Sequence, residues 1–175
     1  YKSSNRNATH RKVLLTDITY LSYGNYQRAY LSTIKDAETT ELLAYRLSTN
    51  LYLDFVLNTM WDLVKQKEVP IPKDAFVHSD QGSHYTSPIF QSLLKELKLG
   101  QSMSRRGNCW DNSPQESFFG HMKDEIDLKS CKTFKDLQLE IDRYIEYYNN
   151  YRYQWDLKKM SPVQYRNHLL QTTTN

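Results

Sequence analysis

The order of hydrophobic patterns along the chain predicts an α/β fold, in which helices pack against a sheet. Three segments typical of β-strands come first, followed in turn by a helical pattern, a strand, a helix, a strand and further helices. The first and fourth predicted strands each end close to an aspartate, Asp17 and Asp80. Because this order allows the first and fourth strands to lie side by side, we expect these two carboxylates to be neighbours.

Three strands open the predicted sheet as an antiparallel meander. Residues 13–19 (VLLTDIT), 26–33 (YQRAYLST) and 41–47 (ELLAYRL) are rich in β-branched and aromatic residues. Residues 22–25 (SYGN) and 35–38 (KDAE) are typical of turns and are predicted to connect these strands. The short connections favour antiparallel pairing.

A helix and the fourth strand come next. Residues 51–67 carry apolar side chains at helical spacing, namely Leu53, Val56, Leu57, Met60, Trp61 and Val64. Pro70 and Pro72 then interrupt the chain, and residues 75–79 form a short apolar strand that ends just before Asp80.

The second half of the chain is predicted to be mainly helical. Ser87 and Pro88 begin a helix that Gly100 ends, and residues 99–103 form the fifth strand. Three more helices are predicted, over residues 113–127, after Thr133 and from Ser161–Pro162.

Length and composition fit one globular domain. The 175 residues are 39% hydrophobic and carry a formal net charge of +3, which is compatible with a nucleic-acid partner. Cys109 and Cys131 match no zinc spacing and no disulfide framework, which indicates a reducing, cytoplasmic compartment. No apolar run reaches the length of a membrane span, so we expect no membrane partner.

Three units are predicted along the chain. Residues 1–11 form a polar, basic N-terminal arm, residues 12–151 a catalytic core, and residues 152–175 a C-terminal extension with a short helix. Because the first residue is not methionine, we expect the chain to be a piece of a longer protein.

Asp17, Asp80 and Glu116 are the candidates for a metal-binding catalytic site. Carboxylates held close together repel one another unless cations neutralise them. Carboxylate oxygens suit Mg²⁺ or Mn²⁺, and two such ions can hold the attacking and leaving oxygens during phosphoryl transfer. We therefore expect the three acids to share two divalent ions beside DNA, with neither a protein nucleophile nor a small-molecule cofactor.

Each acid also has a structural interpretation. An aspartate at a strand end commonly forms a turn, and residues 80–83 (DQGS) are typical of one. Glu116 follows Ser113 by three residues, which is the spacing of a helix capping box. Taken one at a time, the three acids are better explained by structure than by catalysis.

The predicted helix over residues 113–127 strengthens the catalytic interpretation of Glu116. At about 100° per residue, Glu116, Gly120 and Lys123 share one narrow helix face. A face with an acid, a glycine and a lysine would allow a phosphate backbone to approach closely. Lys123 is therefore predicted to contact DNA, with a solvated surface lysine as the alternative.

Two long motifs resemble a known family. They are HSDQGSHYTS over residues 78–87 and QSMSRRGNCWDNSPQESFFGHMKDE over residues 101–125. They are similar to the catalytic core of bacterial insertion-sequence transposases of the IS-three group, which belong to the retroviral-integrase-like enzymes. Thirty-five residues separate Asp80 from Glu116, as in that family, and Asp17 and Lys123 match its first acid and its basic residue. The tail over residues 148–170 resembles the end of these proteins.

The resemblance implies both a fold and a reaction. The implied fold is ribonuclease-H-like, with a five-stranded mixed sheet of three antiparallel and then two parallel strands, flanked by helices. The implied reaction is metal-dependent cleavage at the ends of the element, followed by attack of the freed 3′-hydroxyl on target DNA. By analogy, Asp17 would bridge both ions while Asp80 and Glu116 each hold one. The implied setting is a homo-oligomeric synaptic complex at the bacterial nucleoid.

The loop over residues 104–112 supplies further predicted DNA contacts. Arg105 and Arg106 can reach phosphates, Trp110 could stack on an unpaired base, and Asn108 is a further predicted DNA contact. For Trp110, a hydrophobic plug beneath the loop is an equally good interpretation.

Two other functions fit the same residues. One is a ribonuclease-H-like nuclease that only hydrolyses, because water and a 3′-hydroxyl can use the same metal pair. The other is a non-catalytic DNA-binding module derived from a transposase, against which the three acids argue.

Overall fold

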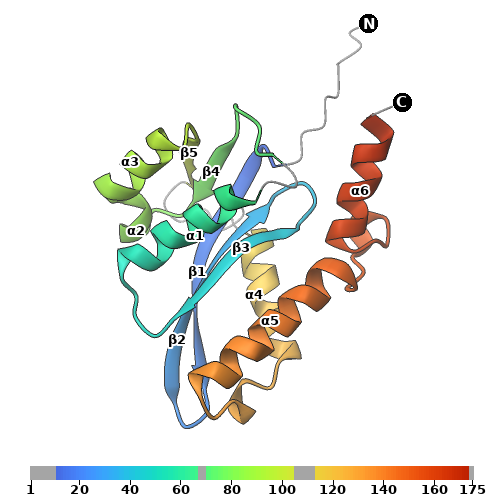
Figure 1. Ribbon diagram of the computed structural model, residues 1–175. Helices are drawn as coiled ribbons and strands as arrows, with labels where there is room; N and C mark the ends of the chain where they lie inside the picture. Colours follow the sequence, from blue (N-terminus) through green and yellow to red (C-terminus); the bar gives the residue numbers. More distant parts are fainter. Residues whose placement is uncertain (1–10, 67–69, 105–112, 174–175) are drawn as a thin grey trace, which may run out of the picture.

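The computed structural model describes residues 11–66, 70–104 and 113–173, and its centre is a five-stranded mixed sheet (Figure 1). The strand order is β3-β2-β1-β4-β5. The strands are β1 (Val13–Tyr23), β2 (Gln27–Asp36), β3 (Leu42–Ser48), β4 (Phe76–Ser79) and β5 (Gly100–Met103). The first three pair antiparallel, whereas β4 and β5 run parallel to β1. The predicted mixed sheet, with its first and fourth strands adjacent, is confirmed.

The first two strands are longer than predicted. β1 continues through Tyr23 because Leu21 and Tyr23 keep alternating into the core, so the turn is limited to residues 24–26. Gly24 has a φ of +50°, and a Cβ there would lie 2.8 Å from the Cys131 carbonyl oxygen. The predicted turn at residues 35–38 is wrong for Lys35, which is a buried residue of β2.

The segment between β4 and β5 holds two helices, α2 (Ser83–Thr86) and α3 (Pro88–Glu96). The α3 start is as predicted, since the Ser87 side chain accepts a hydrogen bond from the Ile89 N–H. The predicted end is wrong, because Lys98 takes the positive φ of 57° that reverses the chain. Gly100 instead begins β5, where a Cβ would lie 3.0 Å from that of Phe76.

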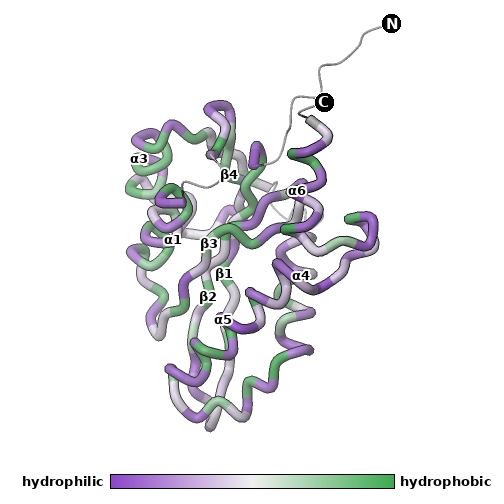
Figure 2. Tube along the Cα trace, turned by 45° about the vertical axis from the view of Figure 1, so that its right-hand side comes forward, coloured by the Kyte–Doolittle hydropathy of each residue, from purple (hydrophilic) through white to green (hydrophobic). Residues whose placement is uncertain are grey.

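Helices cover both faces of the sheet and create two hydrophobic cores. On one face α1 (Leu53–Lys65) and α3 pack over β-strand residues that include Leu14 and Ile34. On the other face α4 (Ser113–Glu125) and α5 (Phe134–Asn150) pack over residues that include Leu21 and Leu31. Figure 2 shows hydrophobic residues gathered along the strands, with hydrophilic ones recurring along the outer helices. The sheet is thus a central layer between two helical layers.

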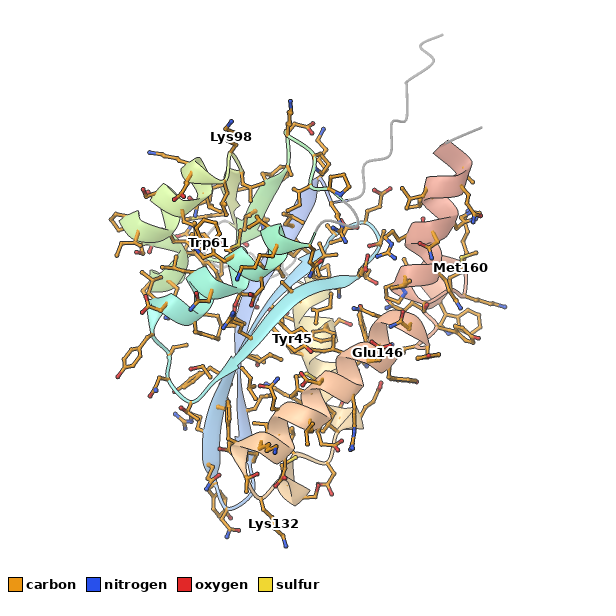
Figure 3. All side chains as sticks on the ribbon, in the orientation of Figure 1. Tyr45, Trp61, Lys98, Lys132, Glu146 and Met160 are labelled. Carbon is orange, nitrogen blue, oxygen red and sulfur yellow. The ribbon has the colours of Figure 1, made fainter. Side chains whose placement is uncertain are left out.

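The α5 helix begins as predicted. Thr133 and Asp136 form a reciprocal capping box, with N–H to side-chain distances of 2.9 and 3.1 Å. On its sheet side, the Tyr45 hydroxyl of β3 donates to the Asp142 carboxylate at 2.8 Å (Figure 3).

The chain after α5 folds into a hairpin and a final helix, α6 (Pro162–Thr173). Two 3₁₀ turns, η2 (Leu128–Ser130) and η3 (Trp155–Leu157), precede α5 and α6 respectively. Within the described parts of the chain, no helix is long and apolar enough to span a bilayer.

Candidate active site

Leu15 of β1 pairs with a strand on each side. Leu15 pairs with Lys35 on β2 and with His78 on β4. Asp17 lies two residues beyond Leu15, and Asp80 lies two residues beyond His78. Because parallel strands advance at the same rise, the two aspartates lie at the same level, two residues past the last β1–β4 pair.

The two aspartates share a pocket. Asp17 and Asp80 both line a cavity of about 300 Å³ at the end of β4. The other described residues around it are Ile18, Tyr20, Tyr30, Leu51, Gly82, Ser83, His84 and Tyr85. Because both side chains line the same pocket, Asp17 and Asp80 lie near each other, as the strand order predicted.

The predicted turn after Asp80 is also present. The Gly82 N–H donates to the Asp80 Oδ1 at 2.9 Å. A Cβ built on Gly82 would lie 2.9 Å from the same oxygen, so glycine is the residue that lets the carboxylate fold back this closely. The turn holds the Asp80 side chain at the pocket while leaving it exposed to solvent.

Asp17 is half-buried, and the Ile18 N–H donates to its Oδ1 at 2.7 Å. Behind it the fully buried Tyr85 hydroxyl lies 3.4 Å from the Thr16 hydroxyl. Burial raises the pKa of Tyr85 well above its ordinary value, and the charges of Asp17 and Asp80 raise it further. Tyr85 therefore stays protonated and adds no negative charge beside the two acids.

The first turn of α4 is pinned to β1 by Gln115, which is 0% exposed. Its Nε2 donates to the Leu15 carbonyl at 2.8 Å, and its Oε1 accepts from the Thr33 hydroxyl at 3.3 Å. Glu116, the next residue, is exposed and is not among the described residues that line the aspartate pocket. Gln115 therefore anchors the start of α4 to Leu15, which precedes Asp17 by two residues on β1. The backbone at Glu116 is fixed by this anchor.

Lys123 approaches β1 two turns further along α4. Its ammonium donates to the Thr19 hydroxyl at 2.8 Å and lies 5.1 Å from the centre of the Tyr20 ring. Partial burial lowers the pKa of Lys123. A Cβ built on Gly120 meets no atom within 4 Å, so the surface beside it is open.

The carboxylates of Asp17 and Asp80 are suitable ligands for a divalent cation, but the distances between the three candidate acids fit a metal site only in part. Asp17 and Asp80 present carboxylate oxygens to one pocket, which is the ligand type that Mg²⁺ and Mn²⁺ prefer. Over residues 11–66, 70–104 and 113–173, however, no three His, Cys, Asp or Glu side chains form a group that could hold a metal ion. The structure thus brings two of the three predicted acids together and leaves the Glu116 side chain apart.

Gln115 and Tyr85 were not predicted, and the sequence carries little signal for them. A glutamine in the first turn of a helix is ordinary, and Tyr85 lies in a polar run without hydrophobic periodicity. Four predicted DNA contacts, Arg105, Arg106, Asn108 and Trp110, lie outside the residues that the structure describes.

Two family models match the chain, and both are described as an integrase core domain. One covers residues 9–109 and the other residues 116–170. Together they include Asp17, Asp80 and Glu116.

The chain is also similar to curated transposases. It is 41% identical over 152 residues to an uncharacterized transposase-like protein of Haemophilus influenzae, covering 86% of this chain and 68% of that protein. It is 38% identical over 154 residues to a putative transposase for insertion sequence element IS150 of Escherichia coli, covering 87% and 53%. The chain spans between about half and two thirds of the length of these relatives.

Among solved structures, the chain resembles retroviral integrase catalytic cores. It matches that of HTLV-2 integrase, solved in complex with magnesium, with a TM-score of 0.71 at 13% identity, over 91% of this chain and 98% of that one. It matches that of BIV integrase with a TM-score of 0.69 at 14% identity, over 94% and 99%. The predicted ribonuclease-H-like fold is confirmed.

Proposed function

The chain belongs to the integrase core domain family and is the core of an insertion-sequence transposase, and from this premise we propose how it acts. It cuts DNA at the ends of its element and joins the freed 3′-hydroxyl to target DNA. Asp17, Asp80 and Glu116 are its metal-binding acids. We assign the parent element to the IS-three group, on the motifs over residues 78–87 and 101–125.

The observation that carries the proposal is the convergence of three distant segments on Leu15. His78 of β4 pairs with it, and Gln115 of α4 donates to its carbonyl. Each of the three acids is one or two residues from one of these positions along the chain. A strand slip of one residue would turn an aspartate to the opposite sheet face, so this register matters for the site.

Asp17, Asp80 and Glu116 would hold Mg²⁺ or Mn²⁺, with two ions in the site. When bound, such ions activate the attacking oxygen and stabilise the leaving oxygen of the phosphodiester. The protein's own residues supply the frame: Gly82 and Ile18 orient the two aspartates by backbone hydrogen bonds. Glu116 completes the ligand set from the exposed side of the first turn of α4.

Lys123 and the open surface at Gly120 extend this site along α4. We propose that Lys123, held at Thr19, contacts a DNA phosphate near the reacting bond. The loop residues Arg105, Arg106, Asn108 and Trp110 stay predicted DNA contacts.

The setting of the reaction is also proposed. Residues 12–151 would form the catalytic core and residues 152–175 an extension, in a homo-oligomeric complex with two element ends at the bacterial nucleoid. An HTLV-2 integrase core has been solved in trimeric and dimeric forms, which supports oligomer formation as a property of this fold.

The test is strand transfer with a precut element end in the presence of Mn²⁺. Asp17→Asn, Asp80→Asn and Glu116→Gln should each abolish joining, because each removes a carboxylate ligand, while circular dichroism shows an unchanged fold. Asp124→Asn, at an exposed acid on the same helix, is the matched control and should keep full activity. Full activity of any of the three variants would disprove the three-acid site.

The two alternatives give different results in the same assay. A nuclease that only hydrolyses would release cut products and join none of them. A non-catalytic DNA-binding module would show neither product, and calorimetric titration with Mn²⁺ would detect no binding that depends on the carboxylates.

A further inference from the structure

A second pocket lies on the other side of the first turn of α4. Its volume is about 650 Å³, within the range of sites for small ligands. It is enclosed by β2, α4, the end of α5 and the segment that follows α5. The lining residues that matter most are Lys35, Pro114, Arg152, Tyr153, Gln154 and Trp155.

Lys35 gives this pocket a buried positive charge. The residue is 3% exposed, and its ammonium donates to the Pro114 carbonyl at 2.8 Å. It lies 5.6 Å from the ring centres of both Phe118 and Tyr148. Among the described residues no carboxylate comes within salt-bridge distance, and burial lowers the pKa of Lys35. A buried ammonium without a carboxylate partner is costly, and an anion in the pocket would offset that cost.

Two more polar side chains of the pocket are donors. Arg152 lines it while its guanidinium binds the Glu125 carboxylate at 2.8 Å. Gln154 accepts a hydrogen bond from the Thr40 hydroxyl through Oε1, but its buried Nε2 has no partner among the described residues. A buried amide donor without an acceptor favours a ligand that carries oxygen.

The hairpin over residues 154–160 places aromatic rings at the pocket mouth. Gln154 and Met160 form an antiparallel bridge, with the Gln154 N–H donating to the Met160 carbonyl at 3.1 Å (Figure 3). Tyr153 and Trp155 are 68% and 81% exposed, although both line the pocket. The Lys159 ammonium lies 4.8 Å from the centre of the Trp155 ring. The hairpin thus presents large flat rings and a cation to solvent on a hydrogen-bonded backbone.

We propose that this pocket binds a single unpaired nucleotide of a DNA strand, with its phosphate near Lys35 and Arg152 and its base stacked against both Tyr153 and Trp155. Positive charge beside exposed aromatic rings is the combination that binds single strands without sequence preference. The identity of the strand as DNA rests on the proposed function. Pro114 lines this pocket and Glu116 follows it by two residues, so the pocket lies within one helical turn of the proposed third acid along the chain.

The first test measures binding of single-stranded oligothymidylate by fluorescence anisotropy, in EDTA so that no metal contributes. Trp155→Ala and Tyr153→Ala should each weaken binding by roughly 5- to 100-fold, the loss expected for one stacked base. Tyr26→Ala is the matched control, since Tyr26 is 99% exposed at the β1–β2 turn, and it should bind as the wild type does.

The second test detects stacking directly. A protein with Trp61→Phe and Trp110→Phe keeps Trp155 as its one tryptophan, because the chain has three. Since Trp110 is itself a predicted DNA contact, anisotropy first sets the oligonucleotide concentration at which this protein is saturated. Addition of the oligonucleotide should quench its emission. Lys35→Met should lower the slope of log affinity against log salt by about one, as expected for loss of one phosphate contact.

The outcomes separate this proposal from the proposed function. Equal DNA affinity of Trp155→Ala and wild type, or emission that does not change, would overturn the pocket even if strand transfer still needed the three acids. Self-association that Trp155→Ala abolishes, with DNA affinity unchanged, would also overturn it and assign the surface to a second copy. A Trp155 effect that persists in EDTA would support the pocket even if the acid variants kept full activity.

Discussion

Gln115 and Lys35 are two buried polar residues that tie the first turn of α4 to the sheet, yet their surroundings differ. Gln115 is 0% exposed and uses its amide on both sides, donating to Leu15 and accepting from Thr33. Lys35 is 3% exposed, but its amino group meets the Pro114 carbonyl and two aromatic rings instead of a carboxylate.

The difference indicates two roles. A buried polar group whose hydrogen bonds are satisfied stabilises one arrangement of the chain. A buried charge without a counter-charge costs stability, and an anion that binds beside it would offset that cost. This contrast agrees with the two proposals, in which Gln115 holds the candidate acids in register and Lys35 meets a DNA phosphate.

The largest expected effect in stability belongs to Gln115. Gln115→Ala leaves the Thr33 hydroxyl and the Leu15 carbonyl without this partner and opens a cavity, so the free energy of unfolding should fall by about 2–4 kcal/mol. Urea denaturation measures the loss. Gln91→Ala, at an exposed glutamine of α3, is the control and should change stability by less than about 0.5 kcal/mol. If Gln115→Ala were as stable as this control, Gln115 would not be the stabilising anchor that the comparison with Lys35 assumes.

An intermediate effect is expected at Tyr45, whose hydroxyl bonds Asp142 at a half-buried position. Tyr45→Phe removes one satisfied hydrogen bond and keeps the ring, so unfolding should become easier by about 0.5–1.5 kcal/mol. The same denaturation experiment gives the value. A larger loss of stability for Tyr45→Phe than for Gln115→Ala would mean that the more deeply buried side chain is not the more important of the two for stability.

The smallest effect is expected at Lys35. Lys35→Met keeps the stem of the side chain and removes an uncompensated charge, so the free energy of unfolding should change by less than about 1 kcal/mol or rise. A loss as large as that of Gln115→Ala would show that Lys35 is a structural residue after all.

The same variant has a pH dependence of known sign. Burial lowers the pKa of Lys35 in the folded protein, so between that value and the ordinary lysine pKa the unfolded chain binds more protons. Lys35 therefore costs stability at neutral pH, and that cost fades as the pH rises. Between pH 7 and pH 10, the free energy of unfolding of the wild type should therefore rise relative to that of Lys35→Met. A fall relative to Lys35→Met over this range would contradict the expected sign.

The sequence was sufficient for the sheet and for the pair of aspartates. Strand and helix patterns alternate strongly enough to order the elements, and the apolar runs that end near Asp17 and Asp80 belong to neighbouring strands. The family resemblance added the parallel direction of the last two strands and matched Glu116, already a candidate, to the family's third acid. The position of the Glu116 side chain relative to the pocket is not a property that any local pattern encodes.

The misplaced elements have identifiable physical causes. Lys35 looked like a turn residue because burial of a lysine is rare, and here the Pro114 carbonyl and the rings of Phe118 and Tyr148 surround its amino group. Gly100 looked like a helix end because glycine is favoured there, but Lys98 adopts the left-handed backbone instead. The short α2 helix buries only Tyr85, which is too little to leave a periodic signal.

The register at Leu15 also bears on how the molecule folds. The β1–β2 hairpin joins residues that are close in sequence, whereas Leu15 meets His78 and Gln115 across separations of 63 and 100 residues. Closing such long loops costs more entropy and takes more time than closing a hairpin. We expect the meander to form early and the acids to gather only when the chain is almost complete, so that a half-folded molecule would carry the carboxylates without the proposed site.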